Sequence, residues 1–409
     1  MAQKITGLNG EIVAVASEPT RRWVVAFSTE SDVKVLTFPE EGPPVEDAQA
    51  SALTRAALNG LTERTPSVRA EFLRDTLCVG INHFQLNGGG TSAVLAVDLA
   101  TSEVRELCRF DGLFTTPPIV AIDDRFVLAG VYEDQEQTED WVGSVRVFDL
   151  SNRTQHELLR LDFEKDGVAV PVGADTDEDA DWEGVRPLIS HLAYAPPARR
   201  LYLVTQDPDQ GEGNRIRAVT LDMDCRAVGV PEPLLHEIWE PYSPVVGGAC
   251  ASPHRDEAVA VMYASEWEKF VPISAMPGES DFLPAADLHV ARAGEPARRL
   301  AVLGQLGVNI AFYDREAEAP NLPDRFRIHF DFGNAGSEVT PVIALGPDRY
   351  LIALFGGTLT EINIETGKQS VVERFGEPIT ALQNGFDPGT VFVGLVTGEF
   401  FTVAVPQGA

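Results

Sequence analysis

Apolar and polar residues alternate with a period of two along most of this chain. One kind of run, rich in β-branched and aromatic residues and entered through a turn, occurs seven times: RRWVVAFST (21–29), TLCVGINHF (76–84), DRFVLAGVYE (124–133), RRLYLVTQD (199–207), DEAVAVMYAS (256–265), DRYLIALFG (348–356) and GTVFVGLVTG (389–398). A second alternating run follows each copy, as in GSVRVFDL (143–150). Alternation of Val, Ile and Phe with polar residues is typical of strands that are buried on one face. The pattern therefore predicts an all-β chain.

The repeating unit has four strands. A strand of small residues precedes each of the seven runs, and a more polar strand follows the second run, as in QHELLRLDF (155–163) and KQSVVERFG (368–376). Such a four-stranded antiparallel meander is marginal alone, because it has two open edges and an exposed face. Radial packing of copies removes both problems, and a repeat of about 40 to 50 residues is in the propeller range. We expect a single seven-bladed β-propeller over 1–409.

The first residues predict how the blades close into a ring. ITGLNGE (5–11) is similar to phrases that end other units, such as AALNGL (56–61) and ERFGEP (373–378), whereas the last unit holds only three strands. We expect the N-terminal strand to complete the last blade. The expected blades are 11–60, 66–112, 115–166, 187–238, 245–305, 338–376 and 378–406 plus 3–9, with insertions at 164–186 and 306–336.

These strand pairs carry a family resemblance. GSVRVFDLSNRTQHELLRL and TLTEINIETGKQSVVERFG look like the third and fourth strands of WD40-like or quinoprotein-like seven-bladed β-propellers, and the resemblance covers nearly the whole chain. Gly-His and Trp-Asp, which mark true WD40 repeats, are not in register here, so the resemblance concerns the shape and not that family's hydrogen-bonded tetrad. Eight blades are the structural alternative, because 307–332 has enough strand character for a further blade.

Composition narrows the classes of partner. The chain has 62 acidic and 32 basic residues among 409, a net charge of −30, which argues against nucleic acid or an anionic membrane as the main partner. No apolar run approaches the length of about 18 residues that a membrane helix needs, and the first twenty residues lack a secretory signal. The four cysteines are far apart without CxxC spacing, which favours free thiols in a reducing compartment. We expect a cytoplasmic protein.

Long insertions gather on one face of the predicted propeller. Successive connections of an antiparallel meander alternate between the two ends of the sheet, which places the acidic segments 133–143, 164–184, 206–214 and 265–285 mainly on one face. The opposite face carries arginines in short turns. Tryptophan beside carboxylates suits a cationic or arginine-rich protein partner through cation–π contacts and charge pairing. The expected partner-binding residues are Trp141, Trp182, Trp267, Glu139, Asp140, Asp181 and Glu183.

Two other interpretations of these loops stay open. One is that the charged loops are only solvated, as charged loops often are; the other is that each Trp simply anchors its loop on the rim. We expect a non-enzymatic scaffold for protein–protein interaction; the alternative is a metal-assisted lactonase or hydrolase with its site at the mouth of the central channel. The first strands hold mainly Val, Ala, Ile and Gly, which weakens the enzyme alternative.

Motifs for catalysis or cofactors are sparse. Asp175, Asp177 and Asp179 have the 1, 3, 5 spacing of an EF-hand loop, but Ala180 replaces the required glycine and Arg186 the bidentate glutamate, which leaves a weak Ca²⁺ site as the only cofactor candidate. GxSxG, GxxxxGK[ST] and strand-associated GxGxxG motifs are absent from the sequence. His191, on a predicted first strand, is the best single candidate for a channel histidine.

Overall fold

The structure is a computed structural model in which the chain divides into two compact units. The first unit comprises Met1–Arg109 and His289–Ala409, and the second comprises Phe110–Leu288. The structure describes residues 2–59, 67–85, 89–111, 117–135, 140–161, 164–165, 168–169, 188–206, 215–235, 245–251, 258–264, 269–275, 288–289, 299–303, 309–314, 326–331, 341–346, 349–354, 356–363 and 365–406.

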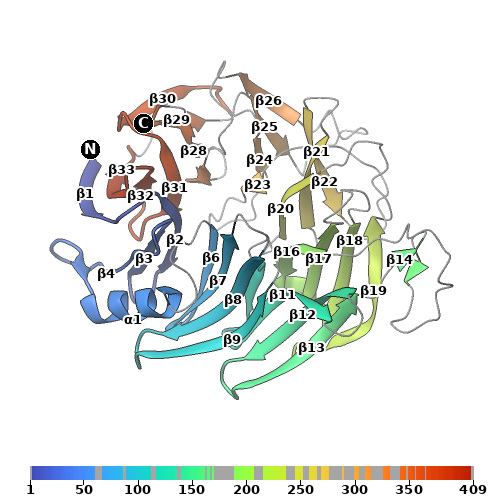
Figure 1. The fold of residues 1–409 in the computed structure, drawn as a ribbon. Helices are drawn as coiled ribbons and strands as arrows, with labels where there is room; N and C mark the ends of the chain where they lie inside the picture. Colours follow the sequence, from blue (N-terminus) through green and yellow to red (C-terminus); the bar gives the residue numbers. More distant parts are fainter. Residues whose placement is uncertain are drawn as a thin grey trace. The chain divides into compact units, whose positions relative to one another are not determined.

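Antiparallel meander sheets make up both units (Figure 1). In the first half of the chain the sheets are β2 (Ile12–Glu18), β3 (Trp23–Ser28), β4 (Val33–Thr37) and β5 (Val45–Glu46); β6 (Ser67–Leu73), β7 (Thr76–Gln85), β8 (Gly89–Asp98) and β9 (Glu103–Asp111); β10 (Ile119–Ile122), β11 (Phe126–Gln135), β12 (Asp140–Asp149) and β13 (Thr154–Leu161); and β16 (Leu188–Ala195), β17 (Arg200–Gln206), β18 (Arg215–Leu221) and β19 (Ala227–Leu235). A small hairpin of β14 (Glu164–Lys165) and β15 (Val168–Ala169) follows β13, and a 3₁₀ turn, η1 (Pro196–Ala198), joins β16 to β17.

The same pattern continues to the C-terminal end. The later sheets are β20 (Val245–Ala251), β21 (Ala258–Ala264) and β22 (Lys269–Ala275); β23 (Leu288–His289), β24 (Arg299–Leu303), β25 (Asn309–Asp314) and β26 (Phe326–Asp331); β27 (Val342–Ala344), β28 (Arg349–Leu354), β29 (Thr358–Asn363) and β30 (Gln369–Arg374); and β31 (Ile379–Asn384), β32 (Thr390–Leu395) and β33 (Glu399–Ala404), which β1 (Ala2–Gly7) completes.

The pairing confirms the predicted fold class. Over the described residues it gives seven four-stranded sheets, one three-stranded sheet and the β14–β15 hairpin. The segment 307–332 contributes β25 and β26, which belong to a sheet of their own with β23 and β24, as the eight-blade alternative expects.

The predicted exchange of the N-terminal strand is also confirmed. β1 runs antiparallel to β33, with Ala2 opposite Val403 and Gly7 opposite Glu399. The Leu8 amide continues the pairing by donating to the Gly398 carbonyl at 2.9 Å. Gly398 has φ +80°, and a Cβ there would lie 2.2 Å from the Leu8 carbonyl oxygen, so this approach requires glycine. The first residues of the chain therefore form the outer strand of its last sheet.

The first sheet differs from the four full strands expected over 11–60. Its fourth strand, β5, has two residues, and helix α1 (Ala48–Asn59) follows. Asp47 caps the helix, because its Oδ1 accepts the Ala50 amide at 2.9 Å, and the segment is rich in alanine, the strongest helix former. The Ser51 hydroxyl accepts a hydrogen bond from the Val35 amide at 2.9 Å. The helix therefore covers the edge of β4 with which a longer β5 would have formed hydrogen bonds.

Hydrophobic clusters fill the spaces between adjacent sheets. Within the first unit one cluster joins the β2–β5 sheet, α1 and the β6–β9 sheet, a second joins the β2–β5 sheet to β31–β33, and a third joins β27–β30 to β31–β33. Within the second unit a cluster joins β10–β13 to β16–β19. The β2–β5 sheet and the β31–β33 sheet are thus each packed between two neighbours, which explains how a small meander becomes stable. No helix in the described part of the chain is long and apolar enough to cross a membrane.

Candidate functional site

Short turns meet at one end of the sheets in the second unit. Arg125 lies in the β10–β11 turn and pairs with Asp149, at the end of β12, at 2.6 Å and with Asp224, in the β18–β19 turn, at 3.5 Å. Arg199, after η1, pairs with Asp123 of the β10–β11 turn. Turns between first and second strands and between third and fourth strands therefore share one end, as the meander predicts.

The first unit repeats this arrangement. Arg21 and Arg22, in the β2–β3 turn, bind in opposite directions: Arg21 to Asp75 of the β6–β7 turn at 3.0 Å and Arg22 to Asp387 of the β31–β32 turn at 3.0 Å. Arg21, Arg22, Arg125 and Arg199, which were expected on a cationic face, thus pair with carboxylates of their own or a neighbouring sheet. This turn end is a belt of ion pairs and not a free basic surface.

Asp149 is the most enclosed carboxylate of this belt. Its side chain is only 6% exposed, and it accepts hydrogen bonds from the backbone amides of Ser151 and Asn152, both at 3.0 Å, and from the guanidinium of Arg125. Burial alone would raise the pKa of Asp149, but these hydrogen bonds outweigh it, and the net shift of the pKa is downward. Asp149 is therefore held as a carboxylate that orders the β12–β13 turn.

The acidic loops leave the second unit from the opposite end. Four strands of this unit end there: β11 at Gln135, β13 at Leu161, β17 at Gln206 and β21 at Ala264. Strand β12 begins at the same end, at Asp140. Strand β16 contacts β10, β11 and β12 on one side and β20 on the other, so these sheets are neighbours. The connections between the ends, 136–139, 162–187, 207–214 and 265–268, are all more acidic than basic in sequence.

The structure places two of the predicted partner-binding residues on this end. The backbones of Asp140 and Trp141 begin β12, opposite Gln135 and Asp134 of β11, at the tip of the described hairpin. Glu139, Asp181, Trp182, Glu183 and Trp267 lie outside the described residues, as do the cation candidates Asp175, Asp177 and Asp179. Among described residues, no group of three or more His, Cys, Asp or Glu is arranged to hold a metal ion. The weak Ca²⁺ site stays a prediction.

His191, the candidate channel histidine, lies on β16. It is half-buried, beside a bulge where the β16–β17 register shifts between Ile189 and His191. Its position on a first strand is the predicted one.

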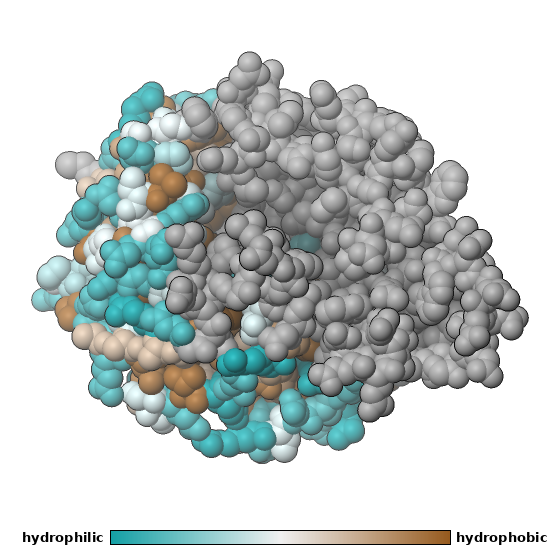
Figure 2. Space-filling model, in the orientation of Figure 1, coloured by the Kyte–Doolittle hydropathy of each residue, from teal (hydrophilic) through white to brown (hydrophobic). Residues whose placement is uncertain are grey.

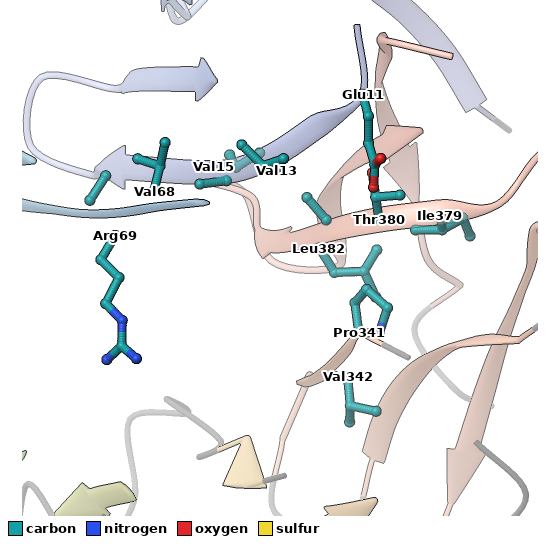
Figure 3. A pocket seen from close by; sticks show the side chains of 13 residues that line it. Glu11, Val13, Val15, Val68, Arg69, Pro341, Val342, Ile379, Thr380 and Leu382 are labelled. Carbon is teal, nitrogen blue, oxygen red and sulfur yellow. The ribbon is translucent and has the colours of Figure 1, made fainter. Parts of the chain in front are cut away.

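A cavity of about 690 Å³ lies within the first unit (Figure 3). Its lining comes from β2, β6 and β31 and from the start of β27, which are the first strands of four sheets. Most of the lining is aliphatic, with Val13, Val68, Val342 and Leu382 among its members. Sequence analysis expected such small apolar residues on first strands.

Arg69 is the exception in this lining. It lies on β6 between the buried Val68 and the partly buried Ala70, opposite Gly80 of β7. Figure 3 shows its guanidinium extended into the cavity, away from the Glu11 carboxylate. Its accessible area is intermediate because one side faces the cavity, yet it lies deep among protein atoms, and this desolvation lowers the pKa of Arg69. Sequence analysis missed Arg69; the available signal was a charged residue inside an apolar first strand.

Comparison with known proteins identifies the fold. No family model matches the chain, and no curated protein sequence matches it. Among solved structures, the chain is similar to Sqt1 from Saccharomyces cerevisiae, at 12% identity and a TM-score of 0.59 over 100% of both chains. It is also similar to the C-terminal WD40 domain of Sif2, at 9% identity and a TM-score of 0.55, over 100% of this chain and 99% of that one. Together with the meander sheets and the N-terminal strand that completes the last of them, these similarities show that the chain has the fold of a WD40-like β-propeller.

Proposed function

We propose that this protein is a non-enzymatic scaffold that binds a protein partner through the acidic loop end of the second unit. The observation that carries the proposal is the ion-pair belt at the turn end. The pairs of Arg125 with Asp149 and Asp224 show that the short turns share one end of the sheets. Because successive connections of a meander alternate between its ends, the long connections emerge at the other end. Loops held on a rigid sheet framework are the usual place for recognition residues.

The chemistry of these loops indicates the class of partner. They combine many carboxylates with Trp141, Trp182 and Trp267, and the whole chain carries a net charge of −30. An indole face attracts a guanidinium or ammonium group, and neighbouring carboxylates pair with it. A partner segment rich in arginine matches both features, and the negative field of the loops would also speed its encounter.

The remaining described surface offers no competing apolar patch. Its exposed large hydrophobic residues are isolated on different turns and strands: Val45, Val104, Met223, Val228 and Val371. Figure 2 likewise shows apolar residues interspersed with hydrophilic ones over the described part of this face. Single exposed apolar residues do not mark an interface, which favours recognition by charge and aromatic anchors.

A binding assay with a defined cationic ligand tests the proposal. The probes are an arginine-rich peptide and a matched lysine-rich peptide, titrated into the full chain at low and moderate salt. We expect Trp141→Ala, Trp182→Ala and Trp267→Ala, combined in one variant, to weaken binding of the arginine peptide about tenfold or more. Added salt should weaken wild-type binding, because the contact is partly electrostatic.

A charge-matched control separates a site from general attraction to an acidic protein. Glu139→Gln, Asp140→Asn, Asp181→Asn and Glu183→Gln remove four charges at the loop end, and Glu30→Gln, Glu41→Gln, Glu365→Gln and Glu377→Gln remove four in the first unit. Only the first set should weaken binding substantially. Equal losses in both sets, or unchanged binding by the tryptophan variant, would show that the loops are merely solvated.

A further inference from the structure

An arginine that has no counter-ion among the described residues lines the cavity of the first unit. Among described residues, no hydrogen bond or ion pair joins Arg69 to a carboxylate, whereas Arg21, Arg22 and Arg349 of the same unit all have acidic partners. Figure 3 shows the guanidinium at the end of an extended side chain. No ion pair with a described residue therefore accounts for its charge.

Such a charge is costly unless something binds it. A guanidinium stays protonated in proteins, so Arg69 cannot relieve its desolvation by losing a proton. A buried charge normally has a partner, and an uncompensated one destabilises the folded state. An anion that enters the cavity would replace the water the side chain has lost with two parallel charged hydrogen bonds.

The rest of the lining restricts the anion. Arg69 is the only cationic side chain among the described lining residues, and Glu11 belongs to the same lining. A dianion such as phosphate would keep one charge that a single guanidinium does not match. A monoanion is matched by one guanidinium, and the planar fork fits a carboxylate in two-point contact.

The aliphatic wall restricts the body of the ligand. Valine, alanine, proline, isoleucine and leucine side chains form most of the lining, contributed by four sheets. The volume of about 690 Å³ is within the range of sites for small organic molecules. Apolar area removed from water on such a wall favours binding of an aliphatic chain.

We propose that this cavity is a binding site for a small monocarboxylate with an aliphatic body, whose carboxylate is held by Arg69. The site lies in the first unit and shares no residue with the acidic loop end of the second unit. It is a further binding activity, independent of the proposed protein partner.

Calorimetric titration of the full chain with three probes tests the ligand class. Octanoate carries both features, octanol has the aliphatic body without the charge, and inorganic phosphate has charge without the body. We expect saturable binding of octanoate at one site per chain, with octanol and phosphate each at least tenfold weaker. Charged hydrogen bonds of this kind are worth about one to two decades in affinity.

Variants at Arg69 test the residue. Arg69→Met keeps the length of the side chain and removes the charge, and it should weaken octanoate about 10- to 100-fold while leaving octanol unchanged. Arg69→Lys keeps the charge but loses the planar guanidinium, so its affinity for octanoate should lie between those of wild type and Arg69→Met. Arg109→Met is the matched control, since Arg109 is exposed, pairs with Glu106 at 2.8 Å and does not line the cavity.

Free-state stability provides a second readout that needs no ligand. Arg69→Met should unfold at the same temperature as wild type or higher, because it removes a desolvated charge that no described residue pairs with. Octanoate should raise the unfolding temperature of wild type and not of Arg69→Met. If Arg69→Met does not fold, the probe series on wild type and the Arg69→Lys affinity decide the matter.

Several results would overturn the proposal. No binding of octanoate, or equal binding of octanoate and octanol, would exclude a carboxylate site. Phosphate binding as tight as octanoate would exclude the aliphatic class. Octanoate affinity that is unchanged in Arg69→Met, or lost equally in Arg109→Met, would show that Arg69 does not hold the ligand.

Discussion

At the scale of single residues, the arginines of this chain differ in whether they form an ion pair with a described carboxylate. Arg125 and Arg199 follow a turn and lie against carboxylates of their own or a neighbouring sheet. Arg69 is inside a strand, and the carboxylates of the turn belt are not its partners. Arg125 and Arg199 therefore act as structural ion pairs at the turn end, whereas we propose that Arg69 binds a ligand.

Asp149 gives a prediction about pH at this scale. Its pKa is lowered in the folded chain, so its ionised form adds stability at neutral pH, above the unfolded value near 4, and that contribution is lost as the pH falls through the folded pKa. We expect Asp149→Asn to lower the free energy of unfolding by about 1–2 kcal/mol at pH 7. Chemical denaturation from pH 7 to pH 3 should show the difference from wild type shrinking below about pH 4.

Asp224→Asn is the control for Asp149. The Asp224 side chain is 68% exposed and reaches Arg125 at only 3.5 Å, so its loss should change the stability by less than about 0.5 kcal/mol. A difference between Asp149→Asn and wild type that stays constant over the pH range would contradict the role of the charge.

Residue-level chemistry was the hardest part to predict from the sequence. The belt of ion pairs joins residues up to 365 positions apart, such as Arg22 and Asp387, and alternation within strands carries no information about such contacts. A charged residue inside an apolar first strand was the only sequence signal for Arg69, and the arrangement of four first strands is what shows that it faces a cavity.

At the scale of elements, strands were predictable because their burial imposes a period of two. All seven aromatic and β-branched runs form the second strand of a sheet, from β3 to β32. The sheet with β24 has RLAVL in that position, a five-residue strand without the long aromatic run, which explains why seven blades were preferred over eight. Its signal was weaker than that of its neighbours.

Helix α1 was not predicted, although its signals are local. Asp47 precedes an alanine-rich stretch, but the repeat itself led us to expect a fourth strand at this position of the unit. Here the local helix propensity and the cap determine the element. The helix binds the edge of β4 through the Ser51 hydroxyl, and Arg55 binds Asp32 just before that strand.

A capping variant tests this account of α1. Asp47→Ala removes the oxygen that accepts the Ala50 amide and should lower the free energy of unfolding by about 1 kcal/mol. Helix-specific loss should appear as faster amide exchange in the first turn of α1. Glu41→Ala, an exposed carboxylate in the preceding loop, should have no such effect, and equal effects of both changes would exclude a capping role.

At the scale of the whole molecule, the sequence predicted the all-β class and the exchange of the N-terminal strand. Both follow from counting strands, since the last unit contains three and the chain opens with a phrase that ends other units. The composition predicted an acidic protein but not where its arginines would be matched. Those details depend on which turns meet, and only the assembled sheets determine that.

Removal of β1 tests its contribution to the fold. Deleting residues 2–7 leaves β33 as an open edge and removes the contacts of the Ala2 amide with Glu373 and of Lys4 with Glu399. We expect a loss on the order of 2–5 kcal/mol, from several backbone hydrogen bonds, and greater aggregation through the exposed edge. A synthetic peptide of residues 1–11 should restore much of the unfolding temperature; no rescue, or no loss on deletion, would contradict the role of β1.

The pairing of β1 with β33 also has a consequence for synthesis on the ribosome. At about 5 to 20 residues per second, β1 waits on the order of 20 to 80 seconds before its partner strand exists. During that time it is an unpaired strand, but its sequence AQKITG contains only one large apolar residue, and none of its residues is fully buried even in the finished sheet. A strand that must wait longest for its partner is thus one of the least apolar, which limits the chance that it pairs with another nascent chain first.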